Sequence, residues 1–257
     1  MAATDLDGRV ALVLGATAGI GRATAEALAD RGARVALAGR RQELAEEAAS
    51  RCGGLGLGAD LTDPASLDAA LDRIDHALGP VDVLVLNGGG PPPSTAVGLD
   101  VATARSAAEL LLYGHLHLVG RCLPGMRQRR WGRIVAIGST AVRQPLPGLA
   151  TSAMFRAALA AYLKLLAEEV ARDGVTVNMV LPGRIATARV ADIDARNAAR
   201  TGATPEEVRA ASEATIPLGR YGAPDEVADA VAYLCGDGAR YLTGEQVRVD
   251  GGSVRAF

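Results

Sequence analysis

The sequence has few of the residues that mark disulfide-rich or zinc-binding proteins, and it lacks a long hydrophobic run. Its 257 residues include three cysteines, Cys52, Cys122 and Cys235, which lie far apart in the chain. This number and spacing exclude a disulfide framework and a paired-cysteine zinc site, so we expect no metal. Although 49% of the residues are hydrophobic, no uninterrupted apolar run approaches the ~20 residues of a membrane span. We therefore expect no membrane association.

The chain also has no excess of positive charge, and it contains few aromatic residues. The formal net charge is -2 at pH 7, and aromatic residues make up 3% of the chain. Nucleic acid is therefore not an expected partner, because broad binding to a phosphate backbone needs a basic surface. The segment from Met1 to Asp7 is acidic and lacks the basic and apolar regions of a secretion signal. We expect a cytoplasmic protein.

What the sequence does contain is an alternation of short β-rich runs with longer helical stretches. The strand candidates are Val10 to Leu14, Arg34 to Ala38, Gly54 to Gly58, Val81 to Leu86, Arg133 to Ile137, Thr176 to Leu181 and Gln246 to Val249. This rhythm predicts an α/β fold, a Rossmann-type doubly wound parallel sheet of about seven strands, as a single domain over residues 1–257. A charged stretch from Ala186 to Thr215 interrupts the alternation irregularly. We expect a substrate lid around residues 186–215.

A glycine-rich turn follows the first strand candidate. The residues Gly15-Ala16-Thr17-Ala18-Gly19-Ile20-Gly21 open a helical pattern from Arg22 to Ala29. Glycines allow a tight turn, and the start of a helix offers unpaired N–H groups and the positive end of its dipole. The order strand, glycine turn, helix predicts a dinucleotide site. A tight turn without a ligand is the alternative interpretation.

Further motifs follow in a consistent order. They are Gly32-Ala33-Arg34-Val35, Ala59-Asp60-Leu61, Leu86-Asn87-Gly88-Gly89, Ser139, Asn178-Met179-Val180-Leu181-Pro182-Gly183 and Asp250-Gly251-Gly252. Together with the glycine turn, these motifs resemble the short-chain dehydrogenase/reductase family over nearly the whole chain. The similarity is closest to its 3-oxoacyl-carrier-protein reductase-like branch. The resemblance implies a nicotinamide coenzyme and a small carbonyl or alcohol substrate.

The end of the second strand candidate bears on the choice of coenzyme. NAD-preferring relatives place an acidic residue there for the adenosine ribose, whereas this chain has Gly39 followed by Arg40 and Arg41. A guanidinium pairs well with a 2′-phosphate, which favours NADP(H) over NAD(H). The alternative is that both arginines are solvated charges that open a helix. The resemblance implies the following cofactor-binding residues: Gly15, Thr17, Ala18, Gly19, Ile20, Gly21, Arg40, Arg41, Asp60, Leu61, Asn87, Gly88, Gly89, Arg156, Pro182, Gly183 and Ile185.

The expected catalytic residues depart from the family pattern. Relatives use a serine, a tyrosine and a lysine four residues after the tyrosine. Ser139 matches the serine, but Ser152 stands in the tyrosine position and Arg156 in the lysine position. An aliphatic hydroxyl is a far weaker acid than a phenol, and a guanidinium stays protonated. Neither residue can therefore replace the tyrosine as a general acid.

His115 is a candidate replacement. It lies four residues after Leu111, which occupies the position of a family asparagine, and hence on the same helix face. A histidine titrates near neutrality, although a packed or interface histidine is the more frequent outcome. Arg143 and Arg184 lie near the expected substrate mouth and suit an anionic substrate, or they pair with nearby acids. Charged residues further along the irregular segment, namely Arg189, Arg196 and Arg200, are expected to face solvent.

Three functions remain open at this point. The resemblance favours an atypical NADP(H)-dependent oxidoreductase acting on a carbonyl or alcohol, in which water, Ser152 or His115 relays the proton. A non-redox lyase, isomerase or dehydratase could instead use Ser139, Ser152 and Arg156 as an oxyanion-stabilising cluster. The third possibility is a catalytically silent nucleotide-binding subunit.

The resemblance also implies self-association. We expect a homotetramer or homodimer that packs through two long helices, at about residues 102–126 and 151–173. The leucines available for that surface are Leu110, Leu159, Leu163 and Leu166. The alternative is that these leucines belong to the protein's own core.

Overall fold

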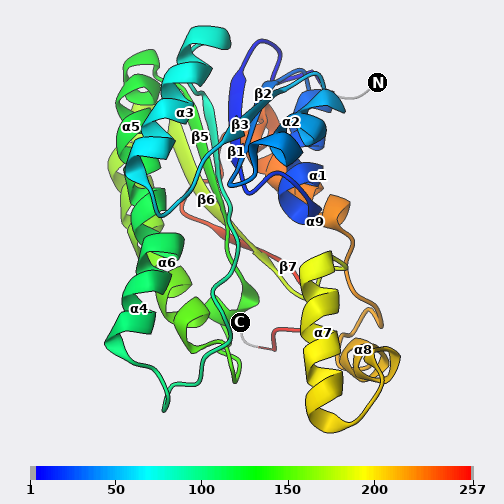
Figure 1. Ribbon diagram of the computed structural model, residues 1–257. Helices are drawn as coiled ribbons and strands as arrows, with labels where there is room; N and C mark the ends of the chain where they lie inside the picture. The colour runs from blue at the N-terminus through cyan, green and yellow to red at the C-terminus, as the bar shows by residue number, and fades with distance from the viewer. Residues whose placement is uncertain (1–3, 256–257) are drawn as a thin grey trace.

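The described part of the chain folds around one parallel sheet of seven strands, in the order β3-β2-β1-β4-β5-β6-β7. The computed structural model describes residues 4–255 (Figure 1). The strands are β1 (Val10–Leu14), β2 (Arg34–Gly39), β3 (Leu55–Gly58), β4 (Val83–Leu86), β5 (Gly132–Ile137), β6 (Val175–Pro182) and β7 (Gln246–Val249). All paired strands run parallel. The predicted doubly wound sheet is confirmed, with strand ends displaced by at most two residues from the expected ones.

Helices cover both faces of the sheet (Figure 1). One face carries α1 (Gly19–Asp30), α2 (Gln42–Ser50) and α9 (Pro224–Cys235). The other carries α3 (Pro64–Ala77), α5 (Gly114–Arg129) and α6 (Ala150–Val170), with α4 (Val101–Ala108) joined to α5 through a π-helical turn at Glu109–Tyr113. The described part of the chain holds no helix that is both long and apolar enough to span a bilayer.

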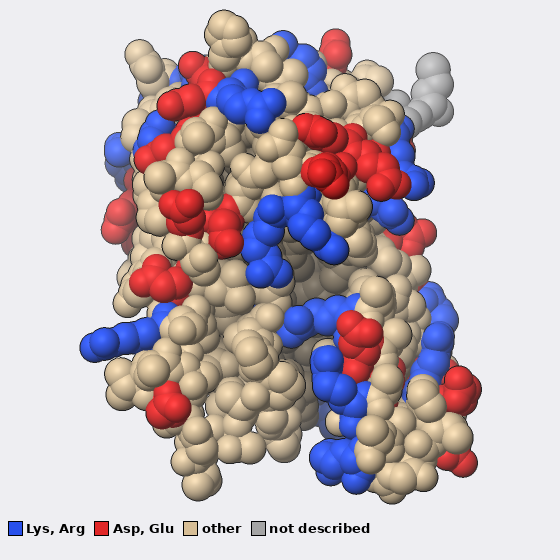
Figure 2. Space-filling model, in the orientation of Figure 1, with Lys and Arg blue, Asp and Glu red and all other residues tan. Residues whose placement is uncertain are grey.

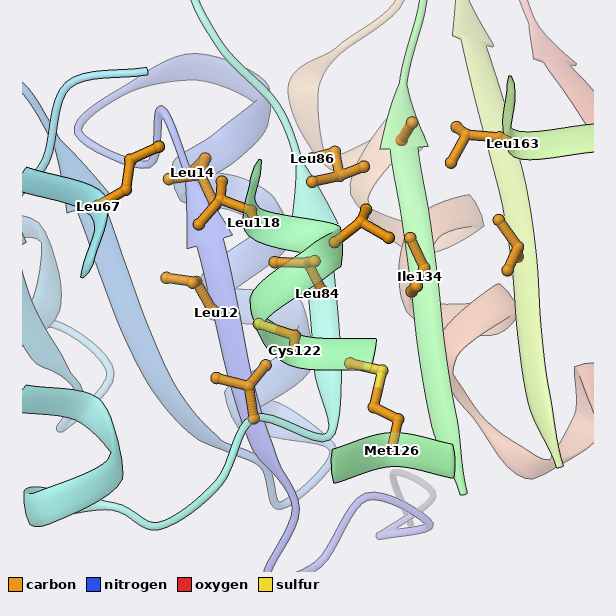
Figure 3. Packing of buried hydrophobic residues seen from close by; sticks show 14 of the residues in the cluster. Leu12, Leu14, Leu67, Leu84, Leu86, Leu118, Cys122, Met126, Ile134 and Leu163 are labelled. Atoms are coloured by element: carbon orange, nitrogen blue, oxygen red, sulfur yellow. The ribbon is translucent and has the colours of Figure 1, made fainter. Parts of the chain in front are cut away.

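The central strands β1 and β4 are apolar along their whole length because both of their faces are buried. Leu12 and Leu84 contribute to the core on the α3, α5 and α6 side, whereas Val13 and Val85 contribute to the core on the opposite side. This alternation follows from the two-residue period of a strand. Figure 3 shows leucines of β1 and β4 packed against Leu118, Cys122 and Met126 of α5.

The leucines expected at a subunit interface lie mainly inside the protein, which corrects that expectation. Leu159, Leu163 and Leu166 are 1%, 3% and 7% exposed and belong to the core, and the partly buried Leu110 packs against it. The large apolar residues that α6 leaves exposed are Met154 and Leu165. Both faces of α6 are rich in alanine and leucine, so the sequence alone could not tell the inner face from the outer one.

The charged segment at residues 186–215 is also more regular than expected. It forms two helices, α7 (Ala188–Thr201) and α8 (Pro205–Glu213), each with a threonine at its N-cap. The side chain of Thr204 and that of Glu207 form a reciprocal capping box, which stabilises the start of α8. A parallel bridge between Ile185 and Gly222 holds together the two ends of this helical pair. We refer to residues 186–215 as the α7–α8 unit.

Candidate functional site

A first cleft opens where the strand order reverses, at the carboxyl ends of β1 and β4. Open parallel sheets bind their ligands at this point. The cleft has a volume of about 400 Å³, and we call it the switch-point cleft. It is lined by these predicted cofactor residues: Gly15, Thr17, Ala18, Gly19, Ile20, Gly21, Arg40, Arg41, Asp60, Leu61, Asn87, Gly88 and Gly89. The remaining predicted residues, Arg156, Pro182, Gly183 and Ile185, are not among the described residues that line it.

Close packing explains the glycines of the turn after β1. A Cβ added to Gly21 would lie 2.3 Å from the carbonyl oxygen of Gly15, and Gly15 itself has a φ of +59°. The Nδ2 of Asn87 donates hydrogen bonds to the carbonyl oxygens of Leu14 at 3.0 Å and Gly15 at 3.3 Å. Asn87 therefore braces the turn. No side chain among residues 4–255 caps the N-terminus of α1, so the first N–H groups of this helix remain available for an anion.

At the end of β2, a side chain in place of Gly39 would have to displace the methyl group of Thr17. A Cβ at Gly39 would lie 2.7 Å from the Cγ2 of Thr17. Arg40 and Arg41 follow and line the same cleft. This position therefore has no carboxylate that could contact a ribose, and the positive charges that follow it suit a phosphate group.

Asp60 is held in its ionised form. Its carboxylate accepts hydrogen bonds from the main-chain N–H of Thr62 at 2.9 Å and from the Thr62 hydroxyl at 2.8 Å. The bond from the Thr62 amide is the main cause that lowers the pKa of Asp60, and the positive charge of Arg40 adds to it. A charged acceptor thus lies at the β3 end of the cleft.

Residues of the α7–α8 unit that the sequence did not predict at the coenzyme site complete the switch-point cleft. Thr187, Ala188 and Arg189 line it together with Leu110. The Thr187 side chain approaches Gly19, since a Cβ added there would lie 3.3 Å from the Thr187 Cγ2. The signal available in the sequence was a hydroxyl residue at the start of a helical pattern, shortly after the carboxyl end of a strand.

A second, larger cleft lies beside the first, between the carboxyl ends of β5 and β6 and the α7–α8 unit. Its volume is about 1270 Å³, and we call it the arginine cleft. Arg189 lines both clefts, so the two are contiguous. Gly183 lines the arginine cleft rather than the switch-point cleft. The pair forms a continuous site large enough for a coenzyme and a second ligand.

Ser139 lines the arginine cleft directly after β5. Its Oγ accepts a hydrogen bond from the main-chain N–H of Ala141 at 3.1 Å and caps the short helix Thr140–Val142. Because the bond from Ala141 uses an oxygen lone pair, the hydroxyl proton remains free to donate to a ligand.

Arg156 lies behind Ser139 and is anchored to the backbone. Its Nη1 donates to the carbonyl oxygens of Ile137 at 2.7 Å and Gly138 at 3.1 Å. Burial lowers the pKa of the guanidinium to about 10, and the nearby charge of Arg189 acts in the same direction. Arg156 is therefore positively charged at neutral pH, and it adds positive potential at the end of β5.

The structure does not bring Ser152 and His115 into either cleft among the described residues. Ser152 is half-buried in the first turn of α6. His115 is 3% exposed, and its Nδ1 lies 3.2 Å from the carbonyl oxygen of Leu111. Burial lowers the pKa of His115 to about 4, with a further contribution from the charge of Arg156. At neutral pH His115 is uncharged, so its predicted use as a proton donor is not supported.

Of the two arginines that the sequence placed near the substrate mouth, Arg184 lines the arginine cleft, whereas Arg143 is not among the described residues that line it. The Nη1 of Arg184 donates a hydrogen bond to the buried carboxylate of Asp194 at 2.5 Å. The same carboxylate accepts a hydrogen bond from the Tyr221 hydroxyl at 2.9 Å. Arg189, Arg196 and Arg200 are exposed to solvent, as expected, and they also line the cleft. Figure 2 shows Lys and Arg side chains gathered around the hollow between the sheet and the α7–α8 unit.

These features define a class: an α/β protein with a dinucleotide-sized crevice at its switch point and a serine facing an adjacent ligand cleft. The chain belongs to the short-chain dehydrogenase/reductase family. The family model described as enoyl-(acyl carrier protein) reductase matches residues 15–254.

Known proteins agree with this assignment. The chain is 38% identical over 250 residues to 3-oxoacyl-[acyl-carrier-protein] reductase FabG of Escherichia coli, covering 96% of this chain and 98% of that protein. It is similar in structure to L-sorbose reductase from Gluconobacter frateurii complexed with NADPH and L-sorbose, with a TM-score of 0.93, 28% identity and 99% of each chain covered. A variant of actinorhodin polyketide ketoreductase with NADPH gives a TM-score of 0.92 and 33% identity, with 100% of each chain covered.

Proposed function

We propose that the protein is an NADPH-dependent reductase acting on a carbonyl substrate, and that it works without the family's tyrosine and lysine. The observation that carries the proposal is the switch-point cleft, where Gly39 leaves no carboxylate and Arg40 and Arg41 offer positive charge. Solved relatives with 28% and 33% identity hold NADPH. The free N–H groups of the first turn of α1 suit its diphosphate.

The arginine cleft then takes the substrate. The coenzyme supplies the hydride, and the protein positions and polarises the carbonyl. Ser139 donates its free hydroxyl proton to the carbonyl oxygen in a hydrogen bond. Arg156, anchored one residue behind Ser139, favours negative charge developing on that oxygen.

The proton that completes the alcohol comes from water in the cleft. Ser152 and Arg156 are too weakly acidic to donate it at neutral pH, and His115 is uncharged there. Because no acid is positioned to donate this proton, we expect carbonyl reduction to be roughly 10²–10⁴-fold slower than in a reductase that has the phenol. The proposal therefore includes slow turnover.

Coenzyme titrations test the first half of this proposal. We expect calorimetry to show tighter binding of NADPH than of NADH. Arg40→Gln should weaken NADPH binding by about tenfold, the loss of one charge-assisted contact, and should leave NADH unaffected. Arg73→Gln, a change at an exposed arginine of α3, is the matched control. Equal affinity for the two coenzymes would overturn the NADPH assignment.

Turnover tests the second half. Oxidation of NADPH with a panel of carbonyl compounds is followed at the nicotinamide absorbance, and Ser139→Ala should reduce it by about 10²-fold or more. Binding of NADPH with no turnover on any carbonyl would favour the silent subunit instead. Product formation without oxidation of coenzyme would favour the non-redox alternative.

We also propose that the chain forms a homo-oligomer through α5 and α6. Tyr113, Met154 and Leu165, on or next to these helices, are 51%, 43% and 63% exposed. Large apolar side chains in such positions favour burial against a second copy. Sedimentation of the purified protein at several concentrations should give a dimer or larger species, and a monomer throughout would contradict the proposal.

A further inference from the structure

We propose that the arginine cleft selects carbonyl substrates that carry an anionic group, a carboxylate or a phosphate ester, on an apolar body. The inference rests on the proposed function and adds the substrate class. It starts from the charges that line the cleft, which include five arginines and one carboxylate, Glu207.

Two of these six charged groups have partners within the protein, but only Arg184 is paired with an opposite charge. Glu207 accepts a hydrogen bond at its Oε2 from the main-chain N–H of Thr204, at 2.8 Å, as part of the cap of α8. Arg184 is neutralised by Asp194. The other four arginines outnumber Glu207, so the cleft wall keeps a positive excess.

Arg189, Arg196 and Arg200 form no ion pair with a carboxylate of the described residues. Arg189 donates to the uncharged carbonyl oxygen of Pro91 at 3.2 Å, so its charge stays uncompensated. Burial and the charge of Arg196 lower the pKa of Arg189, while Asp192 acts more weakly in the opposite direction. Like charges held close together repel, and a bound anion relieves that repulsion.

The position of these arginines distinguishes the substrate from the coenzyme. Arg40, Arg41 and the start of α1 lie at the switch-point cleft, which has its own groups for phosphates. Arg196 and Arg200 line the arginine cleft alone. They are four residues apart on α7 and so project side by side, which suits recognition of one anionic group by two guanidiniums.

The rest of the lining indicates an apolar body for the ligand. Pro91, Leu146, Leu149 and Ile193 line the same cleft as the arginines. A ligand that presents an acid group to α7 and an apolar chain to these residues satisfies both parts of the wall. Its carbonyl would then lie toward Ser139, which lines the same cleft.

Binding of simple probes tests the inference without requiring turnover. Hexanoate, hexyl phosphate and uncharged hexanamide share one chain and differ in the head group. Ligand-observed NMR on the purified protein saturated with NADPH should show both anions bound at least about tenfold more tightly than hexanamide, as expected for a charge-assisted contact. The comparison of hexanoate with hexyl phosphate decides between a carboxylate and a phosphate ester.

Variants then assign the site. Arg196→Gln combined with Arg200→Gln should weaken the better anion by about tenfold or more, and Arg73→Gln should leave it unchanged. Both target residues are exposed on α7, so the variant protein keeps its core. Equal binding of hexanamide, or anion binding that survives the double change, would overturn the inference.

The outcomes also separate this inference from the proposed function. The same NMR measurement is repeated without coenzyme, next to a direct NADPH titration. Anion binding that depends on Arg196 and Arg200 in a protein with no affinity for NADPH would defeat the proposed function and leave the cleft assignment standing. NADPH binding with no preference for the anions would defeat the cleft assignment and leave the proposed function standing.

Discussion

Arg156 is bonded to the last residue of β5, with its Nη1 2.7 Å from the carbonyl oxygen of Ile137. The same nitrogen also reaches the carbonyl oxygen of Gly138, at 3.1 Å. A helix residue thereby holds the loop that presents Ser139 and keeps a positive charge behind it. One side chain therefore provides both structural support and positive charge. A substitution that removes the charge and one that keeps it separate the two roles.

The first prediction concerns Arg156→Met. Removal of the guanidinium leaves two carbonyl oxygens without their donor, and we expect a loss of about 1–3 kcal/mol in the free energy of unfolding. We expect kcat for carbonyl reduction to fall by roughly 10²-fold, as when one stabilising donor is removed. Urea titration and steady-state kinetics measure the two effects. Arg156→Lys retains the charge and should keep more of kcat, and equal rates in both variants would refute the electrostatic role.

The second prediction restores the family's pair. Ser152→Tyr together with Arg156→Lys introduces a phenol and the lysine that lowers its pKa. If proton supply limits the native protein, the double variant should reduce carbonyls roughly 10²–10⁴-fold faster. Ser152→Phe with Arg156→Lys is the matched control, since it adds the ring without the acidic hydroxyl. A gain in the control equal to that in the tyrosine variant would show that proton supply is not the limit.

The strands and the glycine turn were predictable because their signals are local. Val10–Leu14 is apolar on both faces and is followed at once by a turn that needs glycine at Gly15 and Gly21. The resemblance implied that Asn87 belongs to the coenzyme site, but its two hydrogen bonds to the turn after β1 join distant parts of the chain and are shown only by the structure.

The positions of several charged residues were not predictable, since they depend on how α7 packs. The fate of Arg196 is decided by which face of α7 meets the cleft, and the periodicity of the segment does not specify its orientation. Arg184 and Asp194 are ten residues apart and meet because α7 turns back toward the end of β6. Burial of His115, which removes its charge at neutral pH, is likewise a property of the packed helices.

The third prediction is a pH dependence of stability that arises from His115. Its pKa is about 4 in the folded protein, below the ordinary value of 6.5. As the pH falls below 6.5, the unfolded chain takes up a proton that the folded protein does not, so folding is progressively disfavoured until about pH 4. The shift corresponds to about 3 kcal/mol over that interval.

Urea unfolding of the native protein and of His115→Gln, at pH 7 and at pH 4.5, isolates this contribution. Carboxylates with lowered pKa values, such as Asp5 and Asp60, also lose stabilising interactions in acid. These carboxylates are the same in both proteins, so their contributions cancel when the two losses of stability are subtracted. We expect the native protein to lose more stability than His115→Gln on acidification. Parallel losses would show that His115 is not the group responsible.

The last prediction concerns the attachment of the α7–α8 unit, which we propose acts as a lid. Asp194 is 4% exposed and receives hydrogen bonds from Arg184 and Tyr221, one from each side of the unit. Asp194→Asn removes the charge that compensates Arg184. Because the side chain of Arg184 is 37% exposed, water replaces part of that interaction, and we expect a loss of only about 1–2 kcal/mol.

Asp194→Asn should change the opening of the α7–α8 unit more than it changes the free energy of unfolding of the whole protein. A loosened unit opens more often, so trypsin should cleave at its arginines faster, and KM for the carbonyl substrate should rise more than kcat falls. Glu213→Gln is the matched control, since it breaks the i,i+4 pair between Arg209 and Glu213 on the same unit, a pair worth about 0.5 kcal/mol or less. Identical digestion rates for the two variants would show that the bonds to Asp194 do not hold the lid closed.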